Sequence, residues 1–324
     1  MRRIIATWLL VILVATGALS LGYAADYPNR PIRLIVPYPA GGVLDTSARI
    51  IGRKLGEFLG QQIVIDNRPG ASGTLGDAVV ARSEPDGYTL LLTSGDFIIM
   101  PSLVPTMSFD PYKDLAPIAL VGSTPMILVA NINAPFNNVK ELIAAAKAAP
   151  GSIGYSTPGA GTINNVAGEW VAHAAGIKLL HVPYRGGAPA ANGVAAGDVP
   201  LGVISPSSAL SLLDAKRVKV IGLTGKRRPE YAPASWPTLA EGGVDIDSML
   251  WNGVFAPAGT PSAILGRLSK ELVRAAHDPE VRKALNKAGI DAESIVQPQF
   301  GERIRTDATR YKDIIEKTGI KISR

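Results

Sequence analysis

The chain has 324 residues, of which 47% are hydrophobic and 19% charged, and it contains no cysteine. A chain of this length exceeds one typical hydrophobic core, so two domains are expected. The lack of cysteine excludes disulfides, thiolate nucleophiles, metal thiolates and a lipidated cysteine anchor. The formal net charge is +6 and is spread thinly. No basic run is interleaved with aromatic residues, and the densest basic cluster, at 226–228, is typical of a solvated loop, so no nucleic-acid partner is predicted.

The first 25 residues have the pattern of a secretory signal peptide. Two arginines precede an apolar stretch from Ile4 to Leu21, and small residues follow it up to Ala24 and Ala25, near which we expect cleavage. Removal of the peptide and its two arginines lowers the net charge from +6 to +4. A periplasmic location is therefore predicted, with a retained membrane anchor as the alternative, because the apolar run is near the lower length limit for a span.

Apolar runs alternate with helical periodicity from Ile32 to Phe255, which predicts an α/β fold with parallel sheets covered by helices on both faces. From Pro261 onward the pattern is helical, with no strand expected between the segments. In chain order, the predicted strands are 32–36, 62–66, 88–93, 118–121, 126–130, 153–156, 179–182, 201–204, 218–223 and 253–256.

The C-terminal helices have apolar faces that must be buried against another part of the protein, and we expect these helices to pack against the first domain. That packing makes the first domain discontinuous, with one chain crossover near Pro125 and another near Trp251. The predicted division is residues 26–125 with 252–324 in domain 1 and residues 126–251 in domain 2, with the ligand cleft between them.

A glycine-rich turn joins the first predicted strand to the first predicted helix, in the segment from Tyr38 to Asp45. Gly41 and Gly42 leave the backbone open to close approach. The first N–H groups of the following helix have no intrahelical acceptor and lie at the positive end of its dipole, which favours an anion. The alternative is an ordinary strand–helix turn with a helix cap.

A second turn of the same kind follows the strand predicted at 153–156. The hydroxyls of Ser156, Thr157 and Thr162 and the amides from Gly159 to Thr162 are candidates to meet a ligand from the side opposite the first turn. In a two-lobed α/β protein the carboxyl ends of both sheets can face one cleft. The alternative is that Ser156 and Thr157 only satisfy their own loop.

A third segment, residues 181–189, again joins a strand to a helix through two glycines. Tyr184 is a candidate for the wall of the cleft, and Arg185 is a candidate partner for a carboxylate. Arg185 is equally compatible with a plain surface position.

Enzyme signatures are missing from the sequence. A nucleophile-elbow pentapeptide does not occur, and the three histidines, His173, His181 and His277, are too widely spaced for a local metal motif. The glycine turns match neither a dinucleotide fingerprint nor a phosphate-binding loop. We therefore expect no catalysis, no cofactor and no metal.

Taken together, several motifs resemble the Bug family of extracytoplasmic solute-binding proteins, the receptors of tripartite tricarboxylate transporters. The resemblance covers nearly the whole mature chain and rests on residues 27–42, Asp45 with Arg49, and residues 66–73, 85–91, 155–162, 182–190 and 255–261. One departure is Pro200, where the family commonly has Asp, so the resemblance makes no prediction for the inner face of that loop.

The resemblance implies a two-lobed, type II periplasmic-binding-protein-like fold of the Venus-flytrap kind. It has two mixed, mainly parallel sheets flanked by helices and a helical C-terminal tail. It also implies closure on a small carboxylate, often through ordered waters. The residues it suggests for the binding site are Tyr38, Ala40, Gly41, Gly42 and Leu44 on one side and Ser156, Thr157, Gly161 and Thr162 on the other.

Asp45 matches a family position that can cap the helix or meet an amino group of the ligand, and both roles stay open. Val43 and Leu44 are apolar where the family varies, which favours a plain or aromatic carboxylate over a zwitterion. The partners implied are a small organic anion with one to three carboxylates and integral membrane transporter subunits. We expect a monomer. An exported sensor without a transport role and a secreted serine hydrolase are the alternatives.

Overall fold

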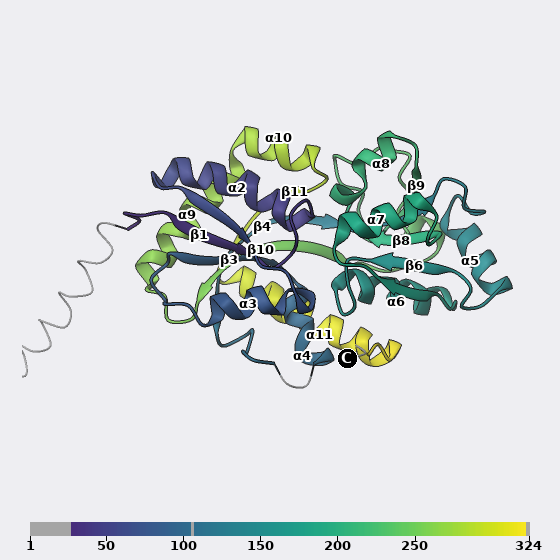
Figure 1. The fold of residues 1–324 in the computed structure, drawn as a ribbon, viewed down its shortest axis with the longest axis horizontal. Helices are drawn as coiled ribbons and strands as arrows, with labels where there is room; N and C mark the ends of the chain where they lie inside the picture. Colours follow the sequence, from purple (N-terminus) through teal and green to yellow (C-terminus); the bar gives the residue numbers. More distant parts are fainter. Residues whose placement is uncertain (1–26, 105–106, 322–324) are drawn as a thin grey trace, which may run out of the picture.

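The computed structural model describes residues 27–104 and 107–321, so the predicted signal peptide lies outside the described residues. Two sheets lie end to end along the molecule, each covered by helices (Figure 1). The first sheet has six strands: β1 (Ile32–Val36), β2 (Ile63–Asn67), β3 (Thr89–Ser94), β4 (Leu115–Pro125), β10 (Met249–Pro257) and β11 (Asp291–Val296). The second has five: β5 (Ile127–Asn131), β6 (Gly154–Thr157), β7 (Leu180–Pro183), β8 (Leu201–Ile204) and β9 (Val218–Leu223).

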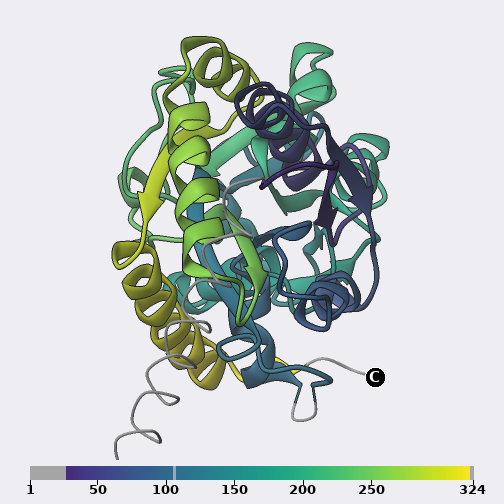
Figure 2. The ribbon, with the colours of Figure 1, turned by 90° about the vertical axis from the view of Figure 1, so that its left-hand side faces the viewer.

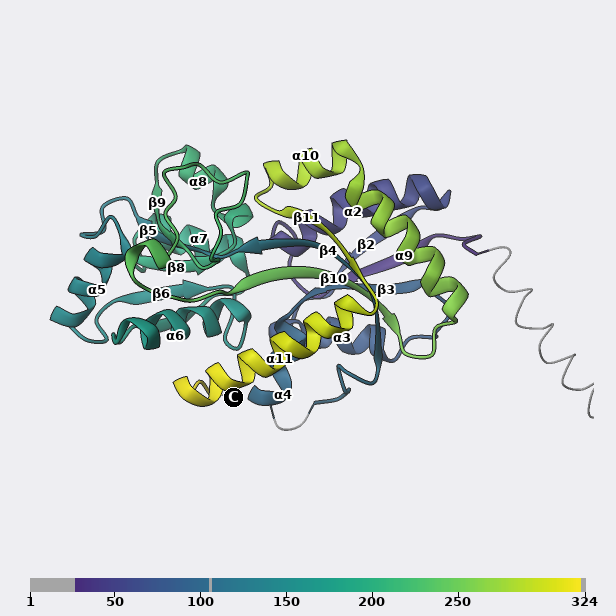
Figure 3. The same ribbon diagram turned by 180° about the vertical axis from the view of Figure 1, so that it is seen from behind.

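Helices gather on both sides of the strands, as Figure 2 shows from the end of the first sheet. Around that sheet the helices are α2 (Val43–Leu59), α3 (Thr74–Ala81), α4 (Asp96–Leu103), α9 (Ser262–His277), α10 (Pro279–Lys287) and α11 (Gln299–Thr318). Of these, α2, α9 and α10 lie on one side of the sheet and α3, α4 and α11 on the other (Figure 3). Around the second they are α5 (Val139–Ala148), α6 (Ile163–Ala175), α7 (Gly187–Ala196) and α8 (Leu210–Asp214). Short 3-10 turns lie at Ala71–Gly73, Pro206–Ser208 and Ala240–Gly242.

The chain passes between the sheets on two adjacent strands. β4 ends at Pro125 and the chain enters β5 in the second sheet, while β10 carries it back and pairs antiparallel with β4 from Met249 to Pro257. In the first sheet the strand order is β11-β4-β10-β3-β1-β2, and in the second it is β7-β6-β8-β5-β9. The α/β fold with two mixed sheets is confirmed.

The expectation of mainly parallel sheets needs correction. Parallel pairing joins β1 to β2 and β3, and β6 to β7 and β8. The other five pairs are antiparallel. The physical reason is the double crossing: a chain that leaves along β4 and returns along the neighbouring β10 must run in opposite directions on those strands.

Beyond Pro261 the sequence predicted helices only, and the structure adds the strand β11 at the edge of the first sheet, where it pairs with β4. All six of its residues are half-buried. An edge strand of this kind carries no run of buried apolar side chains, so its sequence lacks the signal from which strands were predicted.

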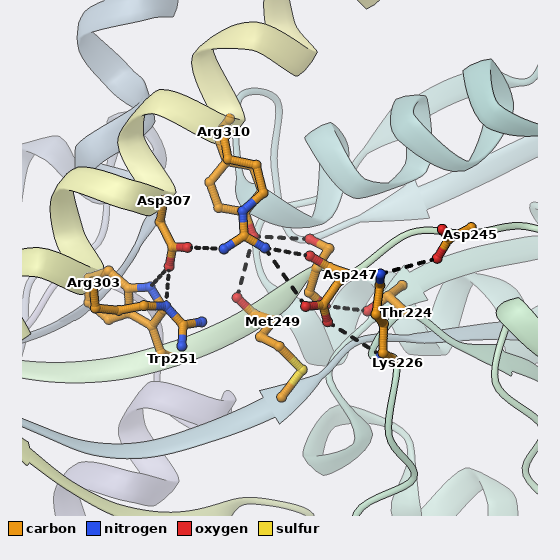
Figure 4. A network of polar contacts seen from close by, with 11 residues as sticks. Thr224, Lys226, Asp245, Asp247, Met249, Trp251, Arg303, Asp307 and Arg310 are labelled. Atoms are coloured by element: carbon orange, nitrogen blue, oxygen red, sulfur yellow. Dashed lines mark hydrogen bonds and ion pairs between the residues drawn. The ribbon is translucent and has the colours of Figure 1, made fainter.

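The C-terminal helix α11 contacts both α4 and α6 and lies across the back of the molecule (Figure 3). A buried carboxylate ties it to the crossing strand: Asp307 accepts hydrogen bonds from Trp251 Nε1 at 2.9 Å, Arg303 Nε at 2.6 Å and Arg310 at 2.5 Å (Figure 4). Arg310 also donates to the carbonyl of Asp247 at 2.9 Å, just before β10 begins. Across the two described ranges, no helix combines the length and apolarity that a bilayer crossing requires.

Candidate ligand-binding site

A cavity lies between the carboxyl ends of the two sheets, where the turns after β1 and β3 face the turns after β6 and β8. In open α/β sheets this is the usual position for a ligand. From the first sheet it is lined by Tyr38, Pro39, Ala40, Gly42, Val43, Leu44, Ser94 and Asp96. The opposite wall is formed by Pro158, Asn164, Gly186, Gly187, Ala188, Pro189, Ser205 and Ser208, and the crossing strand β10 adds Leu250.

The volume of the cavity is about 50 Å³, which is more than one water molecule needs. Its wall is largely apolar, with a few hydroxyl, amide and carboxyl groups. Among the described residues that line it, none is lysine or arginine. An anion in this cavity must therefore be bound by backbone N–H groups and neutral side chains.

The start of α2 supplies such N–H groups. Gly41 adopts φ +87°, a left-handed conformation that side chains other than glycine rarely take, and Gly42 precedes the helix without a side-chain cap. The first helical bond of α2 runs from the Thr46 N–H to the Gly42 carbonyl. The N–H groups of Val43, Leu44 and Asp45 have no acceptor among the described residues. This helix end is thus equipped to bind an anion next to the cavity.

Asp45 points back along its own helix rather than into the cavity. Its Oδ2 accepts from the Gly41 N–H and from Arg49 Nε, both at 3.0 Å. Burial raises the pKa of Asp45, but the hydrogen bonds from Arg49 and Gly41 outweigh it, so the pKa lies below its ordinary value. These contacts hold the turn before α2 and cap none of the first N–H groups of the helix, so neither of the two roles considered from the sequence is assigned to Asp45.

Four of the residues named from the sequence line the cavity: Tyr38, Ala40, Gly42 and Leu44. Gly41 lies exposed in the same turn. The structure therefore places the first turn at the cavity, and a role of this turn in ligand binding stays a prediction.

The residues named from the second turn are close by but do not line the cavity. Ser156 is fully buried and donates to the Ala190 carbonyl, and Thr157 donates to the Gly159 carbonyl. Both hydroxyls therefore donate their hydrogen bonds within the second lobe. The Gly161 N–H donates to Asn165, and Thr162 caps α6 by accepting from the Asn165 N–H at 3.3 Å.

Tyr184 and Arg185 line a neighbouring groove between the same two sets of loops. This groove has a volume of about 450 Å³ and also contacts Tyr38, Pro39 and Gly186, which it shares with the cavity. Arg185 is exposed at its edge. The groove and the cavity therefore share part of one wall.

The sequence reasoning missed Ser94, Asp96, Asn164, Ser205 and Ser208. A signal was present for most of them. Ser94 is the last residue of β3, which pairs in parallel with β1, and Asp96 lies two residues further on. Ser205 directly follows β8, which pairs in parallel with β6. The rule that identified the first turn, applied to the end of every strand, would have included these residues.

Comparison with known proteins identifies the family. Residues 47–320 match the model of the tripartite tricarboxylate transporter family receptor. The chain belongs to this family. Its members are solute-binding receptors rather than enzymes, which agrees with the missing catalytic signatures and confirms the family resemblance noted in the sequence.

Full-length relatives and solved structures support the assignment. Protein BugT of Bordetella pertussis is 31% identical, over 99% of this chain and 99% of its own length. The structure of the periplasmic binding protein BugD matches with a TM-score of 0.84 at 31% identity, covering 91% of this chain and 99% of BugD. R. palustris Rpa4515, solved with adipate, matches with a TM-score of 0.87 at 29% identity, covering 91% of this chain and 99% of Rpa4515.

Proposed function

We propose that this receptor captures a small organic carboxylate in the cavity between its two sheets and delivers it to the membrane subunits of a tripartite transporter. The signal-peptide pattern of the first 25 residues and the periplasmic relative BugD favour the periplasm as the place of capture. The relative solved with adipate favours a carboxylate as the ligand.

The observation that carries the proposal is the start of α2. Three consecutive N–H groups, those of Val43, Leu44 and Asp45, have no acceptor among the described residues, and the first two belong to residues that line the cavity. A carboxylate oxygen is the natural acceptor for such a helix end. The apolar side chains of Val43, Leu44 and Leu250 then face the body of the ligand.

Capture proceeds by movement of two lobes, residues 26–125 with 252–324 and residues 126–251, about the crossing strands β4 and β10. The two separate sheets support this division, and contacts between the lobes join them. Ser72, in a loop of the first lobe, donates to the Ala160 carbonyl of the second at 2.6 Å. Ala71 and Ser72 both adopt left-handed φ values, +46° and +53°. This conformation costs free energy for residues other than glycine, and it sets the direction of the backbone in this loop.

A thermal-shift screen of mono-, di- and tricarboxylates tests the proposal. A ligand present at 100 times its dissociation constant stabilises the folded state by about 2.7 kcal/mol. For a chain of this size that raises the melting temperature by about 5 °C.

The control is the uncharged amide of each acid, which keeps the ligand body and removes the anion. We expect the carboxylates to raise the melting temperature and the amides to leave it unchanged. Equal shifts with acid and amide, or no shift with any carboxylate, would contradict the proposal.

A further inference from the structure

The carboxyl group of Asp96 lies at the start of the other lobe's helix. Asp96 is the first residue of α4, follows β3 of the first sheet and is 4% exposed. Its Oδ1 accepts from the N–H of Ile163 at 2.6 Å, and Ile163 is the first residue of α6, which covers the second sheet. A side chain of one lobe therefore fills an anion-binding position of the other.

Further hydrogen bonds hold Asp96 in place. Its Oδ2 accepts from the hydroxyl of Ser94 at 2.8 Å and from the hydroxyl of Tyr38. Tyr38 itself lines the cavity next to the start of α2. Ser94 and Tyr38 belong to the same lobe as Asp96, so movement of the lobes apart would break only the bond to Ile163 and leave its N–H without this acceptor, which is costly.

The two helix starts at the cavity therefore differ. At α6, the N–H of Ile163 is taken by Asp96 and the N–H of Asn165 by Thr162, while the N–H of Asn164 between them has no acceptor among the described residues. At α2, the N–H groups of Val43, Leu44 and Asp45 have no acceptor in the described part of the chain. One end of the cavity can receive a carboxylate, and the other already holds one belonging to the protein.

We propose that Asp96 determines specificity by occupying the α6 end of the cavity, so that the receptor selects ligands with a single carboxylate over ligands with two. This inference rests on the proposed function and names its ligand class. The ligand carboxylate binds at the start of α2, and its apolar body lies against Val43, Leu44 and Leu250. A second carboxylate at the far end cannot accept the hydrogen bond from the N–H of Ile163, because Asp96 already accepts it. That second carboxylate would instead lie next to the carboxyl group of Asp96.

The test compares ligand pairs that differ only in the second carboxylate: butyrate with succinate, hexanoate with adipate, and benzoate with terephthalate. Isothermal titration of the full mature protein gives the dissociation constant of each. We expect the monocarboxylate of a pair to bind at least 10-fold more tightly. In Asp96→Ser, which frees the N–H of Ile163, we expect this ratio to fall at least 10-fold.

Two variants serve as controls. Glu169→Gln removes the same charge from the surface of α6 and keeps an acceptor for the Tyr155 hydroxyl, so it should leave the ratio unchanged. Asp96→Asn keeps an oxygen acceptor for Ile163 and should retain the preference for monocarboxylates. The wild-type comparison decides the matter even where Asp96→Ser does not fold.

The proposal is overturned when the dicarboxylates bind the wild-type protein as tightly as their partners or more tightly. It is also overturned when Asp96→Ser keeps the wild-type ratio. Binding of no member of any pair counts against the proposed function itself, so the two failures are distinguishable.

Discussion

Replacement of Asp307 with alanine is expected to lower the free energy of unfolding by about 3–5 kcal/mol, the usual cost of removing one partner of a buried ion pair. Asp307 is 1% exposed and is the shared acceptor for Trp251, Arg303 and Arg310 (Figure 4). Its loss leaves a buried indole N–H and two guanidinium groups without their partner. Urea denaturation followed by circular dichroism measures the change.

The matched control is Asp313→Ala on the same helix. The side chain of Asp313 is 55% exposed and pairs with Lys317 four residues on, an interaction worth at most about 1 kcal/mol. A loss in Asp307→Ala no larger than the loss in Asp313→Ala would show that the network does not hold α11 to the crossing strand.

The second large effect is expected on binding. Ala188, in the first turn of α7, lines the cavity from the lobe opposite α2. Ala188→Asp places a carboxylate there, and an acidic residue in the first turn of a helix does not destabilise it. Repulsion between this group and the ligand carboxylate is expected to cost about 2.7 kcal/mol, a loss of about 100-fold in affinity, measured by titration with the best ligand of the screen.

Ala188→Asn is the matched variant, because asparagine has nearly the same shape as aspartate without the charge. We expect it to lose far less affinity than Ala188→Asp, since only steric crowding remains. Similar losses in the two variants would indicate crowding alone and would argue against an anionic ligand at this place.

Much of the fold was predictable because it depends on local patterns. The bounds of β1, β8 and β9 were predicted without error, since each is a short apolar run between clear turn signals. The buried stripe of α2 and the cap of α5, where the side chain of Asn138 accepts from the Glu141 N–H, also follow from residues close in sequence. The turn after β1 was predicted for the same reason.

The second wall of the cavity was not predictable in this way. Ser156 belongs to a motif that looks suited to binding, yet its hydroxyl faces Ala190, and no local pattern reports that packing. The contact between Asp96 and Ile163 joins residues 67 positions apart, at the starts of helices that cover different sheets. Such a contact depends on how the lobes meet, which a single sequence does not encode in its local pattern.

The most direct test of the account is a crystal structure of the protein with the tightest-binding carboxylate of the thermal-shift screen. We expect a carboxylate oxygen within hydrogen-bonding distance of the N–H groups of Val43, Leu44 or Asp45, directly or through one water, with the ligand body between the two sheets. A carboxylate bound away from the start of α2 would contradict the account.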